Sequence, residues 1–260
     1  MDLTTLIGIV VAFGGLLLGY VLEHGSIPAL FLLSPAVIVF GGTFGATLTS
    51  FQFRQIKKVP GLFLSTFRSS AAEEIVKVSA TLEEMAQLVK VNGFLSLEGY
   101  LQQHDDIDPI LKRGVLLMMD GADSQRIEES MEADIAIIEQ TKHSEIAVFE
   151  AMGGYSPTMG VAGTVMGLVQ TLSHMASPEE LAGAIASAFI ATLYGIAFAN
   201  LLYLPVASKL KMNLKTHGIC YELQVKGVVS IQKGFNVRAI KEMIVPYLEA
   251  VGAQPEGGGD

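Results

Sequence analysis

The chain has 260 residues, of which 50% are hydrophobic and 17% are charged, and its formal net charge is −9. Its mean hydropathy of +0.47 is too high for an ordinary soluble domain of this length. A single cysteine, Cys220, excludes an internal disulfide and a cysteine-based metal site. The composition therefore indicates a membrane protein with a soluble part.

Two uncharged stretches near the amino terminus have the length of membrane spans. Residues 3–22 are apolar and contain glycines that let helices approach closely in lipid, and residues 29–53 form a second uncharged run. Crossing the hydrocarbon layer takes roughly 20 apolar residues. The first stretch lacks a positive flank and an Ala-x-Ala site, so we expect a retained span and not a signal peptide. We predict two transmembrane helices within residues 1–53.

Two further uncharged stretches, residues 151–175 and 181–207, are separated by a short connection. Both are apolar apart from small and hydroxyl-bearing residues, and both exceed the length of a span. We therefore predict the third and fourth transmembrane helices within residues 151–208. Pro157 and Pro205 lie near matching ends of these helices, so we expect kinks at a similar depth.

The basic residues predict the orientation of the chain. Ten of the seventeen Lys and Arg residues lie between the second and third spans and seven lie after the fourth, whereas the connections 23–28 and 174–180 contain none. Lys and Arg accumulate on the cytoplasmic side of membranes. We therefore expect residues 54–150, the tail 209–260 and both termini to be cytoplasmic, in a multi-pass protein of the cell (inner) membrane.

Periodic apolar residues predict a helical domain over residues 54–150. A first amphipathic helix ends at Asn92-Gly93, because these residue types tolerate the left-handed conformation of helix ends. Its apolar face consists of Ile75, Val78, Leu82, Met85 and Leu88. A loop over 102–109 and a short helix over 110–119 are expected to follow.

A long helix then begins and is expected to continue directly into the third span. It is marked by Ile127, Met131, Ile135 and Ile138. The tail is predicted to hold helices over 219–231 and 237–251 and a disordered end over 254–260. Strand alternation and hairpin turns are missing, so the expected fold is all-α: a polytopic membrane protein with four transmembrane helices and a helical cytoplasmic domain.

The four predicted spans contain hydroxyl groups but no Asp, Glu, Lys or Arg. Proton relays in membranes are built from Asp, Glu or His, so a partner helix would have to supply the titratable group if this protein conducts ions. Thr164 and Thr192 lie near the middle of the third and fourth spans, and Thr171 lies on the same face as Thr164. They are candidates to line an ion path. Alternatively, each hydroxyl bonds only the carbonyl four residues earlier on its own helix.

Gly160, Gly163 and Gly167 form a small-residue face that favours helix packing over a nucleotide loop, because no strand precedes it. An intramembrane hydrolase needs a nucleophile–base pair or a metal motif, and the five histidines lack ligand spacing. We expect no enzymatic activity, no catalytic residue, no metal, no cofactor and no nucleic-acid partner.

The third and fourth spans resemble those of a known family. The sequence YSPTMGVAGTVMG over 155–167, with ATLYG over 191–195 and LPVA over 204–207, resembles the MotA, PomA and MotP flagellar stator subunits of the MotA/TolQ/ExbB ion-channel superfamily. The likeness covers nearly the whole chain and includes KVNGFLSLE over 90–98 in the large insert. The TolQ and ExbB branch has three spans, so four predicted spans favour a stator.

The resemblance implies a channel that couples a flow of protons or sodium ions to torque on the flagellar rotor. A MotB-like single-span partner would supply the ion-carrying Asp, within a pentamer of this chain around a partner dimer in membrane lipid. Thr164, Thr192 and Thr171 would line the ion path, and Pro157 and Pro205 would act in the conformational cycle.

Lys90 and Glu98 would meet the rotor protein FliG through complementary charges, from the two sides of one exposed turn. Proton-driven members carry Arg at the position of Lys90, and Thr at position 164 is commoner in sodium-type members, so the coupling ion stays open. The alternatives are a TolQ/ExbB-type proton-channel energiser of a cell-envelope process and a solute transporter.

Overall fold

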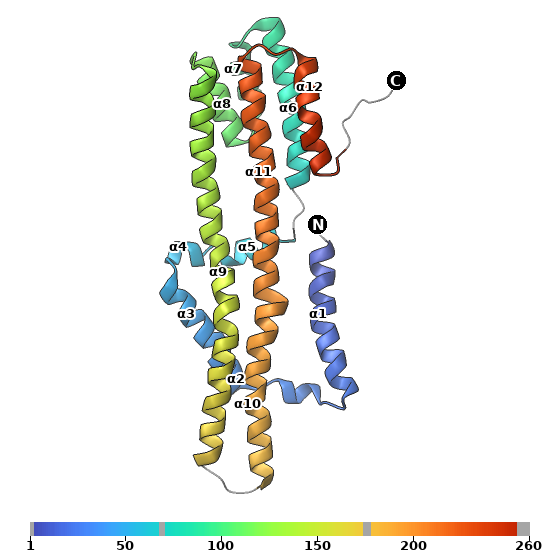
Figure 1. The fold of residues 1–260 in the computed structure, drawn as a ribbon, viewed down its shortest axis with the longest axis vertical. Helices are drawn as coiled ribbons and strands as arrows, with labels where there is room; N and C mark the ends of the chain where they lie inside the picture. The colour runs from blue at the N-terminus through green and yellow to red at the C-terminus, as the bar shows by residue number, and fades with distance from the viewer. Residues whose placement is uncertain (1–2, 68–70, 174–177, 254–260) are drawn as a thin grey trace. The chain divides into compact units, whose positions relative to one another are not determined.

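The structure, a computed structural model, describes residues 3–67, 71–173 and 178–253 (Figure 1). All regular elements in these ranges are helices, which confirms the all-α prediction. The predicted disordered end, 254–260, and part of the predicted connection 174–180 lie outside the described residues.

The chain folds into two compact units, each built from two separate pieces of sequence. The first unit comprises Met1–Arg68 and His143–Lys211, and the second comprises Ser69–Lys142 and Met212–Asp260. The sequence analysis divided the chain into four consecutive segments, 1–53, 54–150, 151–208 and 209–260. The boundaries of these segments stay predictions.

The first unit begins with short and long helices in sequence order. They are α1 (Leu3–Leu22), the 3₁₀ helix η1 (Ile27–Leu30), α2 (Leu33–Ala36), the π-helix η2 (Val37–Gly41), α3 (Gly42–Ser50), α4 (Phe53–Ile56) and α5 (Val59–Ser65). The unit is completed by the later part of α9 (Ser124–Ser173), α10 (Pro178–Phe198), the π-helix η3 (Ala199–Tyr203) and the start of α11 (Leu204–Gln232).

Three helical segments in the described residues are long and apolar enough to cross a membrane: Leu3–Leu22, Ile27–Ser50 and Leu181–Gln232. The predicted third span is the end of α9, which is one helix from Ser124 to Ser173 and continues into the span as expected. The serines, threonines and glycines of this segment, together with Gln170, lower its mean hydropathy. The count of four spans therefore stays a prediction.

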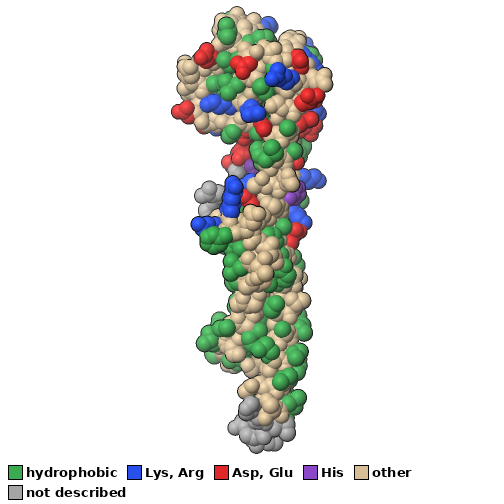
Figure 2. All heavy atoms as spheres, turned by 90° about the vertical axis from the view of Figure 1, so that its left-hand side faces the viewer, with side chains coloured by type: hydrophobic (Ala, Val, Ile, Leu, Met, Phe, Trp, Pro, Cys, Tyr) green, Lys and Arg blue, Asp and Glu red, His purple; other side chains and the backbone are tan. Residues whose placement is uncertain are grey.

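The first unit buries little apolar surface within one chain. No residue of α1 is buried, and Figure 2 shows hydrophobic side chains spread over the surface of this part. Aromatic contacts join its helices: the rings of Phe40 and Phe198 lie 4.6 Å apart, and those of Phe13 and Phe198 lie 5.7 Å apart. The Tyr194 hydroxyl donates to the Leu30 carbonyl and accepts from the Leu32 amide, which ties α10 to the start of α2.

The second unit has an apolar core and a charged surface (Figure 2). It contains α6 (Ala71–Asn92), α7 (Ser96–Gln103), α8 (Pro109–Met119), α12 (Val237–Ala250), the start of α9 and the end of α11. The predicted face of the first helix is confirmed for Ile75, Val78, Leu82 and Met85, which are buried, whereas Leu88 is only half-buried.

Several helix boundaries differ from the prediction, and those of α7 and α11 affect the connections between elements. α7 extends to Gln103, so the loop begins later than residue 102. α11 begins at Leu204, whereas the sequence predicted a helix only over 219–231. The reason is that η3 joins α10 to α11 without a break, so the fourth predicted span and the tail helix are continuous. Ser208, Lys211 and Lys215, which follow the predicted span, are exposed on this helix.

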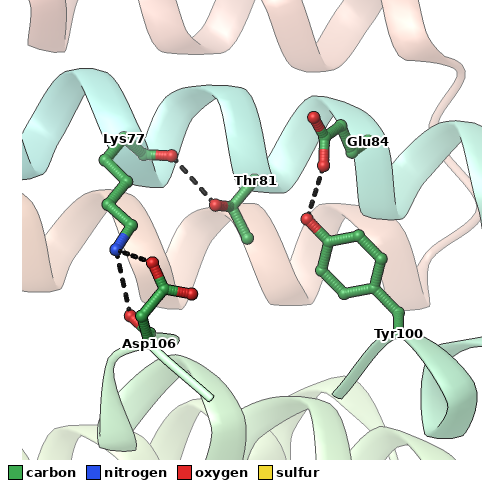
Figure 3. A network of polar contacts seen from close by, with 5 residues as sticks. All are labelled: Lys77, Thr81, Glu84, Tyr100 and Asp106. Atoms are coloured by element: carbon green, nitrogen blue, oxygen red, sulfur yellow. Dashed lines mark hydrogen bonds and ion pairs between the residues drawn. The ribbon is translucent and has the colours of Figure 1, made fainter. Parts of the chain in front are cut away.

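Polar contacts fix α6 against the following segments (Figure 3). Lys77 forms an ion pair with Asp106, and the Tyr100 hydroxyl donates to a Glu84 carboxylate oxygen at 2.5 Å. The Lys77 ammonium lowers the pKa of the Asp106 carboxyl. Burial, reinforced by Glu84, raises the pKa of Tyr100. These contacts hold α7 and the loop after it at a defined place on α6.

Candidate functional site

The site is built where α9 and α10 cross, because glycines there let the two backbones touch. A Cβ atom added to Gly195 would lie 2.5 Å from the Ser156 carbonyl oxygen, and one added to Gly160 would lie 2.9 Å from the Ala191 carbonyl oxygen. Real Cβ atoms do not approach backbone so closely, so only glycine fits at this crossing. The predicted role of the glycine face in helix packing is therefore confirmed for Gly160.

The close approach brings the hydroxyls of Thr164 and Thr192 together at 2.5 Å. Thr164 Oγ1 also lies 2.9 Å from the Ala188 carbonyl oxygen on α10 and 3.2 Å from the Gly160 carbonyl oxygen on its own helix. A hydroxyl has one proton and two acceptor sites, so the pair can satisfy itself in more than one arrangement. Thr164 therefore contacts α10 as well as the carbonyl four residues earlier on its own helix.

Thr171 has the simpler geometry. Its hydroxyl donates to the Gly167 carbonyl oxygen four residues earlier, at 2.7 Å. It also lines a cavity of about 430 Å³ between α2, η2, α9 and α10. Ser34, Gln170 and Ser187 line the same cavity and were not singled out from the sequence, because an isolated serine in a span carries no distinguishing pattern.

No Asp, Glu, Lys or Arg occurs in α9 after Glu150 or in α10 after Glu180, within the residues that the structure describes. The threonine pair (Thr164 and Thr192) and the cavity beside it therefore offer a cation only neutral oxygen atoms. Such a lining can solvate a passing ion but cannot hold or release a proton by titration.

The two prolines lie in different local structures. Pro157 is within α9 and is half-buried, whereas Pro205 is exposed and is the second residue of α11, just after the π-helix η3. Proline lacks an N–H group and its ring crowds the carbonyl four residues earlier, so a widened turn before Pro205 relieves that crowding. π-turns inside helices are frequent at functional sites. Pro205 itself is the sequence signal for this irregular turn, which the sequence analysis did not assign.

Lys90 and Glu98 lie on the two sides of one turn, as predicted. Lys90 is in the last turn of α6, Glu98 is in the first turn of α7, and Gly93 between them has φ +76°. Both side chains are exposed, and neither forms an ion pair with another residue of the described ranges. The apolar side chains of Val91 and Leu95 between them are 75% and 76% exposed.

No group of three His, Cys, Asp or Glu side chains that could hold a metal ion occurs among the residues the structure describes. Cys220 is buried in the second unit, and burial raises the pKa of its thiol to about 11. Burial likewise raises the pKa of Tyr221 to about 12. Both groups are therefore neutral core residues at neutral pH.

Comparison with known proteins identifies the family. The MotA/TolQ/ExbB proton channel family matches residues 102–219, and the amino-terminal region of Motility protein A matches residues 6–93. The chain belongs to the MotA branch of this family. Motility protein A of Bacillus subtilis (strain 168) is 36% identical over 250 residues, which cover 96% of this chain and 92% of that protein.

Two further relatives agree with this assignment. The chemotaxis protein PomA of Vibrio alginolyticus is 32% identical over 251 residues, 95% of this chain and 96% of that protein. The structure of the flagellar MotAB stator complex from Bacillus subtilis superposes with a TM-score of 0.87 at 36% identity and covers 96% of this chain and 97% of that chain. The match to the MotA branch and this superposition favour the stator hypothesis over the two alternatives, a TolQ/ExbB-type energiser and a solute transporter.

Proposed function

We propose that this chain is a flagellar motor stator subunit, which forms an ion channel with a MotB-like partner and converts ion flow into torque on the rotor. The observation that carries the proposal is the threonine pair at the glycine crossing of α9 and α10, in the parts of these helices that follow Glu150 and Glu180 and contain no Asp, Glu, Lys or Arg. Paired neutral hydroxyls suit the lining of a path, and the ion-carrying carboxylate then has to come from the partner.

The membrane topology follows from the same proposal. Four spans place both termini and the Lys90–Glu98 turn in the cytoplasm, and the connections 23–28 and 174–180 outside. A cysteine placed within 24–27 should react with an impermeant reagent in intact cells. Reaction of a cysteine placed within 100–110 under the same conditions would contradict the topology.

The central test removes single hydroxyls from the assembled complex. Thr164→Val and Thr192→Val keep the side-chain shape and delete one oxygen, so ion flux and swimming should fall about tenfold for the loss of roughly 1.4 kcal/mol of interaction with the ion. Thr158→Val is the matched control, because Thr158 is exposed on α9 and donates only to the Tyr155 carbonyl of its own helix.

Expression with and without the partner completes this test. The chain alone should dissipate no ion gradient, because its predicted spans contain no Asp, Glu, Lys or Arg. Conductance by the purified single subunit, or wild-type flux in both threonine variants, would contradict the proposed path.

The proposal assigns rotor contact to the Lys90–Glu98 turn. Rim charges mainly set encounter rate and orientation, so charge reversal should impair swimming and leave membrane assembly intact. A compensating reversal on the rotor protein FliG should restore swimming in part. Normal swimming of the Lys90→Glu, Glu98→Lys double variant in viscous medium, at wild-type expression, would mean that the turn is only a solvated loop.

The finer assembly is a pentamer of this chain around a partner dimer, embedded in membrane lipid. The exposed apolar faces of α1 and of Ile27–Ser50 support this proposal, because they need lipid or neighbouring helices to cover them. Native mass spectrometry of the co-purified complex should give five copies of this chain and two of the partner. Pro157 and Pro205 are assigned to the conformational cycle, and Pro205→Ala should reduce torque without loss of assembly.

A further inference from the structure

We propose that an anionic phospholipid of the cytoplasmic leaflet binds in a groove between α1 and the junction of η3 with α11, with its phosphate at Lys209 and one acyl chain along the apolar floor. The groove is a cavity of about 320 Å³ that lies within the first unit. This inference rests on the membrane topology of the proposed function and adds to it a lipid-binding site and its residues.

The groove has two walls that run in opposite directions (Figure 1). Residues 4–12 of α1 provide one wall, and residues 200–209, from η3 into α11, provide the other. The rings of Phe13 and Phe198, 5.7 Å apart, join the two walls just beyond one end and form the aromatic contact. Near the other end, the Thr5 hydroxyl donates to the Thr66 carbonyl oxygen. The groove is therefore held at both ends by contacts within the chain.

The polar and apolar groups of the lining are separated along the groove. At roughly 1.5 Å per residue, Lys209 lies about 16 Å and Thr5 about 12 Å along their helices from the aromatic contact, so the two residues share the far end. Nearer to that contact the lining includes Ile9, Ala12 and Leu201. Asn200 is a polar exception there, but its amide donates to the Ile196 carbonyl oxygen of its own helix. A polar end followed by an apolar floor matches a phospholipid.

The polar end favours a negatively charged headgroup. Lys209 is half-buried, and it is the one charged side chain among the described residues of the lining. Thr4 and Thr5 bring hydroxyl groups to the same end. In the proposed topology this end lies at the cytoplasmic face, because α1 begins there and the fourth span ends there. Anionic lipids of the cytoplasmic leaflet attract basic residues next to a span, so the charges are complementary.

The shape of the groove suits an acyl chain. Gly8 has no side chain and Ala12 has only a methyl group, so both leave space between the walls. A volume of about 320 Å³ is at the lower end of the range for small-molecule pockets. A helix with its side chains is about 10 Å across and would contact only the rim of this space, whereas a thin and flexible chain can follow it. Pro205 also lines the groove, so the acyl chain packs against the irregular turn at η3.

A small residue of α1 provides a way to fill the groove. Gly8 lines it, and a Cβ atom added there would meet no other part of the chain within 4 Å, so Gly8→Leu occupies the space without a clash. Gly14→Leu is the matched control, because a Cβ at Gly14 also meets nothing within 4 Å and Gly14 does not line the groove. Gly14 lies about one and two-thirds turns after Gly8 and therefore on another face of α1.

A second pair of variants tests the charge. Lys209→Gln removes the positive charge and keeps a side chain of similar polarity at the groove. Lys215→Gln is the matched control, because Lys215 is exposed on the same helix and does not line the groove.

The first experiment measures retained lipid. The complete complex with its partner is reconstituted in vesicles of equal parts phosphatidylglycerol and phosphatidylcholine and extracted in mild detergent, and the bound lipids are quantified by mass spectrometry. Wild type and both controls should retain phosphatidylglycerol in excess. Gly8→Leu should retain less of it, and Lys209→Gln should reduce the preference for it about fivefold. Equal retention of the two lipids by wild type would overturn the site.

Tryptophan fluorescence tests whether the lipid lies in the groove. The chain contains no tryptophan, and Phe13→Trp places one next to the apolar end. Phosphatidylglycerol with brominated chains should quench this tryptophan more strongly than brominated phosphatidylcholine at the same mole fraction, after subtraction of the signal of the wild-type complex. Adding Lys209→Gln should remove the difference. A difference that persists in the double variant would mean that Lys209 does not hold the headgroup and would reject the proposed site.

The lipid site and the proposed channel function fail in different ways. Loss of assembly in Gly8→Leu but not in Gly14→Leu would mean that a helix of another chain fills the groove, and it would reject the lipid site. Wild-type flux and swimming in a complex without a lipid preference would also reject the lipid site and leave the channel. A lipid preference in a complex that conducts no ions would leave the lipid site and reject the channel function.

Discussion

The second unit buries its apolar residues within one chain, whereas the first unit leaves them exposed. In the second unit, residues such as Leu82, Met131 and Leu223 are fully buried in one cluster. In the first unit, α1 contributes no buried residue, and Val10, Leu18 and other large apolar side chains are more than half exposed. Figure 2 shows the matching difference on the surface, with charged side chains concentrated over the second unit.

The difference shows that the two units depend on different solvents. The second unit gains its stability from removing apolar surface from water, as a soluble domain does. The first unit cannot do so alone, because lipid or a neighbouring subunit must cover its helices. What the first unit specifies within one chain is the contact of α9 with α10. Four substitutions test this contrast, from the largest expected effect to the smallest.

The largest effect should come from the glycine crossing in the first unit. Gly195→Val would place its Cβ 2.5 Å from the Ser156 carbonyl oxygen, so α9 and α10 must separate and the threonine pair must break. We expect loss of the assembled complex and of motility, measured by co-purification and swimming. The control is Gly154→Val on α9, because a Cβ there meets no other part of the chain within 4 Å. Equal assembly of the two variants would refute the tight crossing.

The next effect should come from the core of the second unit. Leu82 is fully buried, so Leu82→Ala should destabilise this unit by about 3 kcal/mol through lost burial and a cavity. Leu18 of α1 is 61% exposed, and Leu18→Ala should leave the second unit unchanged. A fluorogenic thiol dye can follow both variants on heating, because the buried Cys220 becomes reactive only when the second unit opens. Similar melting of both variants would remove the contrast between the units.

A smaller effect should appear at high pH. Burial raises the pKa of the Cys220 thiol from its ordinary value of 9.0 to about 11 in the folded chain. Folding is therefore more favourable when the thiol is protonated than when it is ionised. This contribution is complete below pH 9 and is lost as the pH rises toward 11, with a total of roughly 2 to 3 kcal/mol. Urea unfolding followed by circular dichroism should show this loss in wild type. Cys220→Ala should show a shallower decline over the same range, and identical declines would exclude the thiol as its cause.

The smallest effect should come from an exposed ion pair of the second unit. Arg238 and Glu242 pair along one face of α12 with side chains 89% and 69% exposed. Arg238→Ala should therefore change the free energy of unfolding by less than about 0.5 kcal/mol, and less still at high salt. A shift as large as that of Leu82→Ala, in the same dye assay, would show that surface charge contributes to the second unit as much as its core does.

Much of the fold could be predicted because its signals are local. Apolar periodicity identified the buried face of α6, and Asn92-Gly93 identified the turn that separates Lys90 from Glu98. The length of uncharged runs identified the helices that can cross a membrane. The third predicted span is weaker by that measure, because the residues that make its contacts are small and polar.

The sequence by itself therefore determined the all-α class, the apolar helices and the candidate hydroxyls, since each depends on residues close together in the chain. Only the tertiary structure decided that Thr164 and Thr192 bond to each other, that Ser34 and Ser187 share a cavity with Thr171, and that α10 continues through a π-turn into α11. These features depend on how closely two helices approach. That distance is set at Gly160 and Gly195, which are far apart in the sequence and whose packing partners no local pattern reveals.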